Sequence, residues 1–249
     1  SVSNAVIIGR EAATGGNITS AADFTVAVGR EALRALTSGP GNVAVGHYAG
    51  GKITTGAENV AFGSGSLSTN VDGSYNTAIG NLALETFEAD SANHGENTAV
   101  GWKAAANLTT ATNIVAIGAK AMGTGTVTGD SSVAVGYNAG AALTSGDNNI
   151  IIGTNAAKLL TTGQRNIAIG TGALDAANGG EDFNIGIGDG ALGALDGANQ
   201  NVALGCFAGE TATSVTNAVI VGTSACGNGA MTSEADGTVA VGHSALRVL

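Results

Sequence analysis

The chain repeats one stretch, Asn166-Ile167-Ala168-Ile169-Gly170-Thr171-Gly172-Ala173-Leu174, with small changes along almost its whole length. Alignment on the first glycine of this stretch gives fourteen copies, and most neighbouring copies are 17 residues apart. A fixed period of this kind predicts a repeat protein in which each copy forms one coil of a stack. The aligned glycines are Gly9, Gly29, Gly46, Gly63, Gly80, Gly101, Gly118, Gly136, Gly153, Gly170, Gly188, Gly205, Gly222 and Gly242.

The residues directly before each glycine have the pattern of a β-strand. Position −1, counted from the glycine, is always apolar, and position −3 is Val, Ile or Thr in every copy. Alternation of bulky, mostly β-branched residues is typical of a strand, in which side chains two apart share a face. The other face of the strand is apolar too, because position −2 is Ala in ten copies and otherwise Ile or Gly.

A strand that is apolar on both faces is expected to be buried on both. In a single thin solenoid only one face of each strand can point inward, so the stack would expose a long apolar stripe. Exposed apolar patches of that size mark interfaces. We therefore expect an obligate oligomer, and three chains around one axis would shelter the stripe.

Three other positions have structural roles. The invariant glycine indicates a bend with positive φ or a contact that leaves no room for a Cβ atom. Position +3 is Ala in thirteen copies, which indicates tight packing. Asparagine recurs at position −4, where it can hydrogen-bond the same residue in the next coil and form a ladder. These asparagines are Asn42, Asn59, Asn76, Asn97, Asn149, Asn166, Asn184 and Asn201.

The second half of each copy carries apolar residues at +4 and often at +7, and closes with Thr-Thr-Gly or Thr-Ser-Gly, a turn signal. These residues indicate a second short strand or an inward turn, and we expect two short strands and two corners in each coil. The predicted fold is an all-β parallel β-roll solenoid of about 14 coils, forming a single domain over residues 1–249.

Outward-facing positions are the candidates for recognition. Three copies are longer than the rest, and their extra residues should leave the coil as loops at Ala13–Phe24, Glu85–Glu96 and Asn228–Gly237. Charged and aromatic residues also gather at +1 and +2. If these positions face solvent, a partner could bind them. If they have no role in recognition, the loops are tolerated surface insertions and the residues at +1 and +2 form a solubilising face. The candidate surface residues are Arg30, Glu31, His47, Tyr48, Phe87, His94, Trp102, Lys103, Tyr137 and Phe207.

Charge and hydropathy argue against two classes of partner. The net charge of −10 disfavours nucleic acid, because phosphates would be repelled. No run of about 18 apolar residues is present, so we expect no membrane insertion.

The sequence predicts neither a catalytic site nor a cofactor or metal site. Gly188–Gly193 fits the dinucleotide pattern G-x-G-x-x-G, but its glycines belong to the repeat and no helix-forming stretch follows. The three histidines lie in separate copies, and no acid recurs at a fixed position, as a polysaccharide-cleaving solenoid would require. Cys206 and Cys226 lie at different positions of adjacent copies, which predicts two free thiols.

The phrase Asn-x-Ala-Ile/Val-Gly-x-x-Ala, clearest at 76–83, 166–173 and 201–208, resembles the head repeats of trimeric autotransporter adhesins. With Ala-Leu and Thr-Thr-Gly it is also similar to repeats of bacteriophage tail and head fibres. The resemblance implies a left-handed β-roll, a homotrimer, and display on a virion or outside a cell. The 17-residue coils, with Ala at +3 where adhesin heads usually have Ser, favour the phage-fibre relatives.

We therefore expect a structural and recognition segment of a surface fibre, extracellular or on a virion, that attaches to a host through a glycan or protein receptor. Flanking fibre domains or end-to-end stacking are expected beside it, because solenoids need capped ends. The head of a bacterial trimeric adhesin is one alternative. An ice-binding solenoid is another, and it would need a flat array of threonines.

Overall fold

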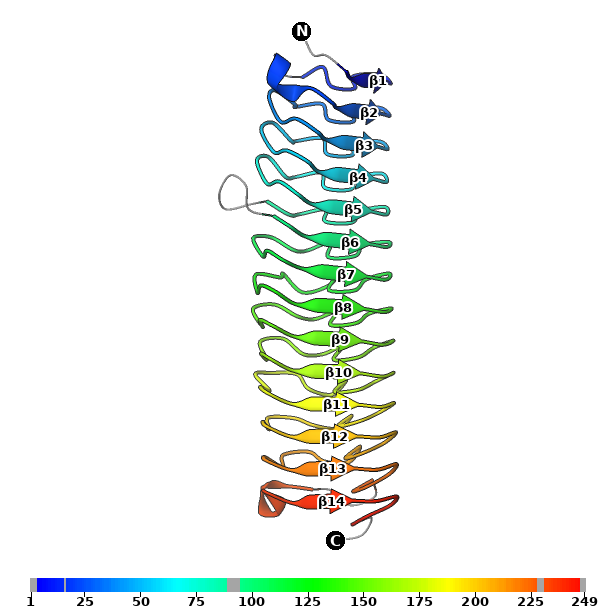
Figure 1. The fold of residues 1–249 in the computed structure, drawn as a ribbon, viewed down its shortest axis with the longest axis vertical. Helices are drawn as coiled ribbons and strands as arrows, with labels where there is room; N and C mark the ends of the chain where they lie inside the picture. The colour runs from blue at the N-terminus through cyan, green and yellow to red at the C-terminus, as the bar shows by residue number, and fades with distance from the viewer. Residues whose placement is uncertain (1–3, 16, 89–94, 228–230, 247–249) are drawn as a thin grey trace. The chain divides into compact units, whose positions relative to one another are not determined.

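The computed structural model describes residues 4–15, 17–88, 95–227 and 231–246. The chain divides into two compact units, Ser1–Thr128 and Gly129–Leu249, here called unit 1 and unit 2. Both consist of coils that each contribute one three-residue strand, ending directly before a repeat glycine (Figure 1). The predicted all-β parallel solenoid with a repeat of about 17 residues is confirmed.

The strands follow one another in sequence order within each unit and pair in parallel. The strands of unit 1 are β1 (Val6–Ile8), β2 (Val26–Val28), β3 (Val43–Val45), β4 (Val60–Phe62), β5 (Thr77–Ile79), β6 (Thr98–Val100) and β7 (Val115–Ile117). Those of unit 2 are β8 (Val133–Val135), β9 (Ile150–Ile152), β10 (Ile167–Ile169), β11 (Ile185–Ile187), β12 (Val202–Leu204), β13 (Val219–Val221) and β14 (Val239–Val241). Pairing joins equivalent positions, for example Ala44 with Ala61.

The expectation of a second strand in each coil is wrong. The second half of the coil is a series of turns, with isolated bridges such as Leu108 to Val127. The reason is the backbone, because the residues at +2 and +4 have positive φ in every copy, as in Lys103 (+54°) and Ala105 (+47°). Residues with left-handed backbone conformation at every second position turn the chain, whereas a strand needs extended backbone. Hydrogen bonds still join successive coils there, for example from the Leu84 N–H to the Ala104 carbonyl at 3.1 Å.

Two of the three longer copies leave the coil through short 3-10 helices. These are η1 (Ser20–Ala22) and η2 (Ser233–Ala235). Thr19 caps η1 by accepting a hydrogen bond from the Ala21 N–H at 3.3 Å.

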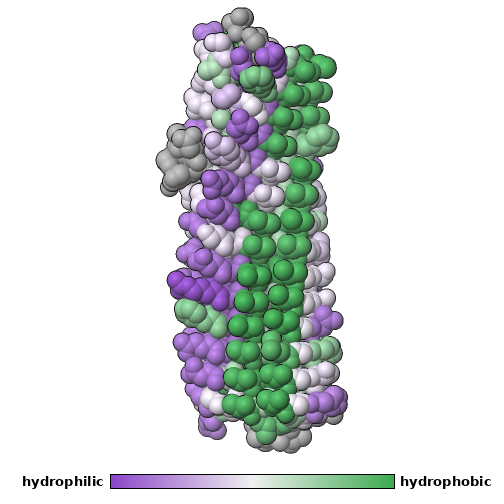
Figure 2. All heavy atoms as spheres, viewed as in Figure 1, coloured by the Kyte–Doolittle hydropathy of each residue, from purple (hydrophilic) through white to green (hydrophobic). Residues whose placement is uncertain are grey.

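The two faces of each strand have different environments. The middle residue, at −2, points into the coil and is buried in β2 to β14, whereas the residues at −3 and −1 point outward and are half-buried or exposed. Within each unit these outward residues form hydrophobic columns, which Figure 2 shows in green. We call them the apolar stripe. Alanine suits −2 because the coil is thin, and the alanine at +3 packs beside it.

The interior of each coil is completed by residues from the turn side. The side chains at +4 and +7 are buried in most coils, for example Leu33 and Leu36 in one copy and Leu192 and Leu195 in another. Large aliphatic groups from one side therefore fill the space left by the small alanines on the other, as close packing of an interior requires.

Hydrogen-bonded asparagine side chains connect successive coils in each unit. The Asn59 side chain receives hydrogen bonds from both the backbone N–H and the Nδ2 of Asn76, each at 3.0 Å. The Asn59 Nδ2 in turn donates to Asn42 Oδ1 at 3.1 Å and to the Gly73 carbonyl at 2.9 Å. The same pattern recurs in unit 2, so the asparagines expected at −4 do form a buried ladder.

The repeat glycine is required for two reasons at once. Gly136 has φ of +135°, and a Cβ atom built on it would lie 2.6 Å from the carbonyl oxygen of Gly153 in the next coil. Real Cβ atoms do not approach backbone so closely, so the two coils would have to separate. The predicted bend and the predicted lack of space are both present.

Replacing this glycine should therefore cost more than conformational strain alone. We expect Gly136→Ala to lower the free energy of unfolding by about 3 kcal/mol or more, because both backbones must move. Gly197→Ala is the matched control, since Gly197 has φ of +72° but nothing within 4 Å of its Cβ position. That change should cost about 1 kcal/mol. Urea unfolding followed by circular dichroism measures both, and equal losses would contradict the steric explanation.

Candidate recognition surface

The corner after each repeat glycine presents its side chains outward. The +3 N–H donates to the glycine carbonyl, as from Ala104 to Gly101 at 3.3 Å, and this closes a tight turn. The residues at +1 and +2 lie at the tip of this turn, and most of those at +1 are exposed. The charged and aromatic residues that the sequence places at +1 and +2 thus lie on the surface, as predicted.

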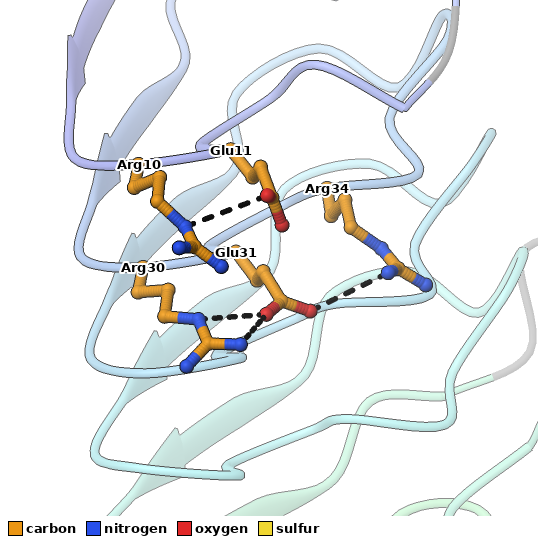
Figure 3. A network of polar contacts seen from close by, with 5 residues as sticks. All are labelled: Arg10, Glu11, Arg30, Glu31 and Arg34. Carbon is orange, nitrogen blue, oxygen red and sulfur yellow. Dashed lines mark hydrogen bonds and ion pairs between the residues drawn. The ribbon is translucent and has the colours of Figure 1, made fainter.

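The first corners of unit 1 carry a network of charged side chains (Figure 3). The Arg30 guanidinium contacts Glu31 Oε1 at 2.8 Å, and Arg34 Nη1 lies 3.4 Å from Glu31 Oε2. In the preceding coil Arg10 and Glu11 form a looser, exposed pair at 3.4 Å. Glu31 is largely covered by its two partners, so it holds the arginines in place and is not itself an open recognition group.

Aromatic rings lie beside this network. The Arg34 guanidinium lies over the Tyr48 ring, 5.7 Å from its centroid, and the His47 and Tyr48 rings are 6.4 Å apart and tilted. His47 is exposed and Tyr48 is half-buried. The structure therefore brings Arg30, Glu31, His47 and Tyr48 together on adjacent coils. Their shared positions, +1 and +2 of successive copies, had predicted that they lie near one another.

A second cluster on unit 1 contains Trp102, Lys103 and Lys120. The ammonium groups of both lysines lie over the indole, at 5.5 Å for Lys103 and 5.1 Å for Lys120. Trp102 is 47% exposed. The arrangement joins an open aromatic surface to two cations.

In unit 2 the candidate residues Tyr137 and Phe207 are both exposed. Phe207 borders a groove of about 510 Å³ that also has the carboxylates of Asp175, Asp189 and Glu210 on its walls. The groove exists because Gly172 and Gly190 occupy +2 in two successive coils, where most other coils carry a side chain. Sequence reasoning missed it, although two consecutive glycines at +2 were a signal.

Phe87 is not a surface residue, contrary to expectation. Its side chain is fully buried. Counting from Gly80 places Phe87 at +7, the same column as the buried Leu36 and Ile53, so the residue belongs to the coil interior. The repeat register contained this signal. His94, the other candidate from this loop, lies outside the described residues.

Two ionisable groups are perturbed by their surroundings. Burial raises the pKa of the Glu88 carboxyl, a hydrogen bond from the Val71 N–H opposes that effect, and the charge of Asp72 reinforces it more strongly than Lys52 offsets it. Burial also raises the pKa of the Cys226 thiol, which disfavours the reactive thiolate. Cys226 and Cys206 are both free, as predicted.

Two kinds of feature are absent from the described part of the chain. It has no group of three or more His, Cys, Asp or Glu side chains placed to hold a metal ion. Within the same residues, no helix has the length and apolar character needed to cross a bilayer.

Comparison with known proteins adds no family assignment. No model of a known protein family matches the chain, and no curated protein matches it significantly.

The environment of Glu88 predicts a pH effect on stability. Because its pKa is raised on folding, the protonated carboxyl contributes stability that is complete below the unfolded pKa and is lost as pH rises through the folded pKa. Glu88→Gln keeps an acceptor for the Val71 N–H and removes the charge. We expect this variant to melt at a higher temperature than the native chain at pH 7 and at the same temperature near pH 3. If the variant is less stable than the native chain at pH 7, the folded protein stabilises the ionised Glu88 carboxylate, and the prediction is wrong.

Proposed function

We propose that this protein is a structural and recognition segment of a surface fibre in which three copies of the chain associate through the apolar stripe. The observation that carries the proposal is the stripe itself. Its members are aliphatic or threonine in every copy except for Phe62, and none is charged. Exposed members include Phe62 at 55%, Ile79 at 39% and Ile152 at 37%.

The length of the stripe supports association more than any single residue does. Soluble monomers rarely expose contiguous apolar patches above a few hundred Å², and here two outward apolar positions recur in every coil. Removing such area from water stabilises by roughly 25 cal/mol per Å². The number three comes from the resemblance of the repeat to trimeric adhesin heads and phage fibres, in which three chains share an axis.

Within such a fibre, recognition belongs to the outward corners. The two clusters of unit 1 and the groove of unit 2 are formed by residues that follow the repeat glycine, and not by the residues at −3 and −1 that make up the stripe. Three copies would present each site three times, so that a weak receptor site gains avidity. The receptor would be a glycan or protein on a host surface, and the fibre would stand on a virion or outside a bacterial cell.

An ice-binding role is not favoured by the threonines. Their hydroxyl groups are used between coils, as from Thr37 to the Thr54 carbonyl at 3.0 Å and from Thr144 to the Thr161 carbonyl at 2.9 Å.

The mass in solution tests the proposal. Light scattering after gel filtration should give about three times the 23.9 kDa of one chain. Ile152→Asp introduces a charge on the stripe and should weaken the assembly, so that on dilution it dissociates at a higher protein concentration than the native assembly does. Thr154→Asp, at an exposed corner of the same copy, is the control and should remain trimeric. A native chain that elutes at the mass of one copy would overturn the proposal.

A further inference from the structure

Trp102 is the only tryptophan of the chain and occupies the first position after its repeat glycine. Nearly half of its surface is open, although a buried tryptophan would contribute more to stability. It is joined to the next coil by a hydrogen bond of 2.9 Å from the Lys120 N–H to its carbonyl oxygen. The backbone that carries the indole is therefore joined to the neighbouring coil.

Two ammonium groups are placed beside this ring. Lys103 and Lys120 both occupy +2 of their copies and have left-handed backbones, with φ of +54° and +59°. Their Nζ atoms lie 5.5 Å and 5.1 Å from the indole centroid, so the two positive charges are at most about 11 Å apart. A cation–π contact at an exposed site contributes about 0.5–1 kcal/mol.

These lysines differ from the arginines of Figure 3 in lacking an acidic partner. Glu31 pairs with Arg30 and Arg34, whereas neither Lys103 nor Lys120 has a carboxylate within ion-pair distance among the described residues. The corner residues nearest to them in register, Asn81, Leu82 and Ala119, are uncharged. The cluster is thus a positive site whose counter-ion the described part of the chain does not supply.

The net charge of the chain does not cancel this local charge. At physiological ionic strength, interactions between exposed charges are screened beyond about 8 Å. Most acidic side chains are in other coils, so the −10 of the whole chain repels an anionic polymer that spans many coils but acts weakly on a small anion at Trp102.

We propose that Trp102, Lys103 and Lys120 form a binding site for an anionic sugar, with the sugar ring against the indole and its carboxylate or sulfate between the two ammonium groups. A sugar ring would cover the open aromatic surface, and its anion would offset part of the positive charge of the two ammonium groups. This inference rests on the proposed role in recognition and gives the receptor a chemical class.

The single tryptophan makes the site directly observable. Fluorescence of Trp102 in the intact protein should change saturably on titration with trigalacturonate or with a sulfated trisaccharide, and the stronger ligand identifies the anionic group. Neutral maltotriose should leave the emission unchanged. Added salt should weaken the binding, because exposed charge pairs are screened.

Lysine variants separate a built site from general attraction. Lys103→Gln combined with Lys120→Gln should weaken binding at least tenfold, whereas Lys52→Gln, which removes an exposed charge from another coil of unit 1, should leave it unchanged. Equal affinity in the double variant and the native protein would overturn the site, as would the absence of any saturable change with either anionic probe. The mass measurement above is independent, so failure here leaves the trimer standing.

Discussion

Close contact between the repeat glycine of one coil and the backbone of the next is the constraint on which the rest of the structure depends. At Gly136 and most of its equivalents no Cβ atom can be accommodated, and the backbone has a positive φ that favours glycine. Coils that stack this closely within each unit must stay in register. In this register each residue lies above the equivalent residue of the next coil. A residue type that recurs at one position of the repeat therefore forms a column along the stack.

Each column then acquires its own physical role. Asparagines at −4 satisfy one another and the neighbouring backbone in a buried ladder, which a single asparagine could not do. Alanines at −2 and +3 keep the coil thin, and a thin coil has no second side on which to bury the residues at −3 and −1. The apolar stripe is therefore a consequence of the same packing that stabilises the coil. Charged and aromatic residues are confined to the corners, where recognition is proposed.

Much of this organisation could be predicted because it repeats. Period, strand position, parallel pairing and the roles of glycine and asparagine all follow from residues that recur at fixed offsets. The turn side could not be predicted, because left-handed backbone at residues such as Leu67 is imposed by coil closure and not by the residue type. Phe87 could have been assigned to the coil interior from its +7 position, but its place in a longer copy favoured the loop. The groove beside Phe207 depends on missing side chains, which leave little pattern in the sequence.

Coverage of the apolar stripe is the central claim, and hydroxyl-radical footprinting of the native protein in solution tests it most directly. Phe62 lies on the stripe and Phe207 at a corner, and in one chain they are 55% and 41% exposed. If copies of the chain cover the stripe, Phe62 will be oxidised several-fold more slowly than Phe207, despite its greater exposure in the single chain. Oxidation of Phe62 at least as fast as that of Phe207 would show that the stripe faces water, and would contradict the account.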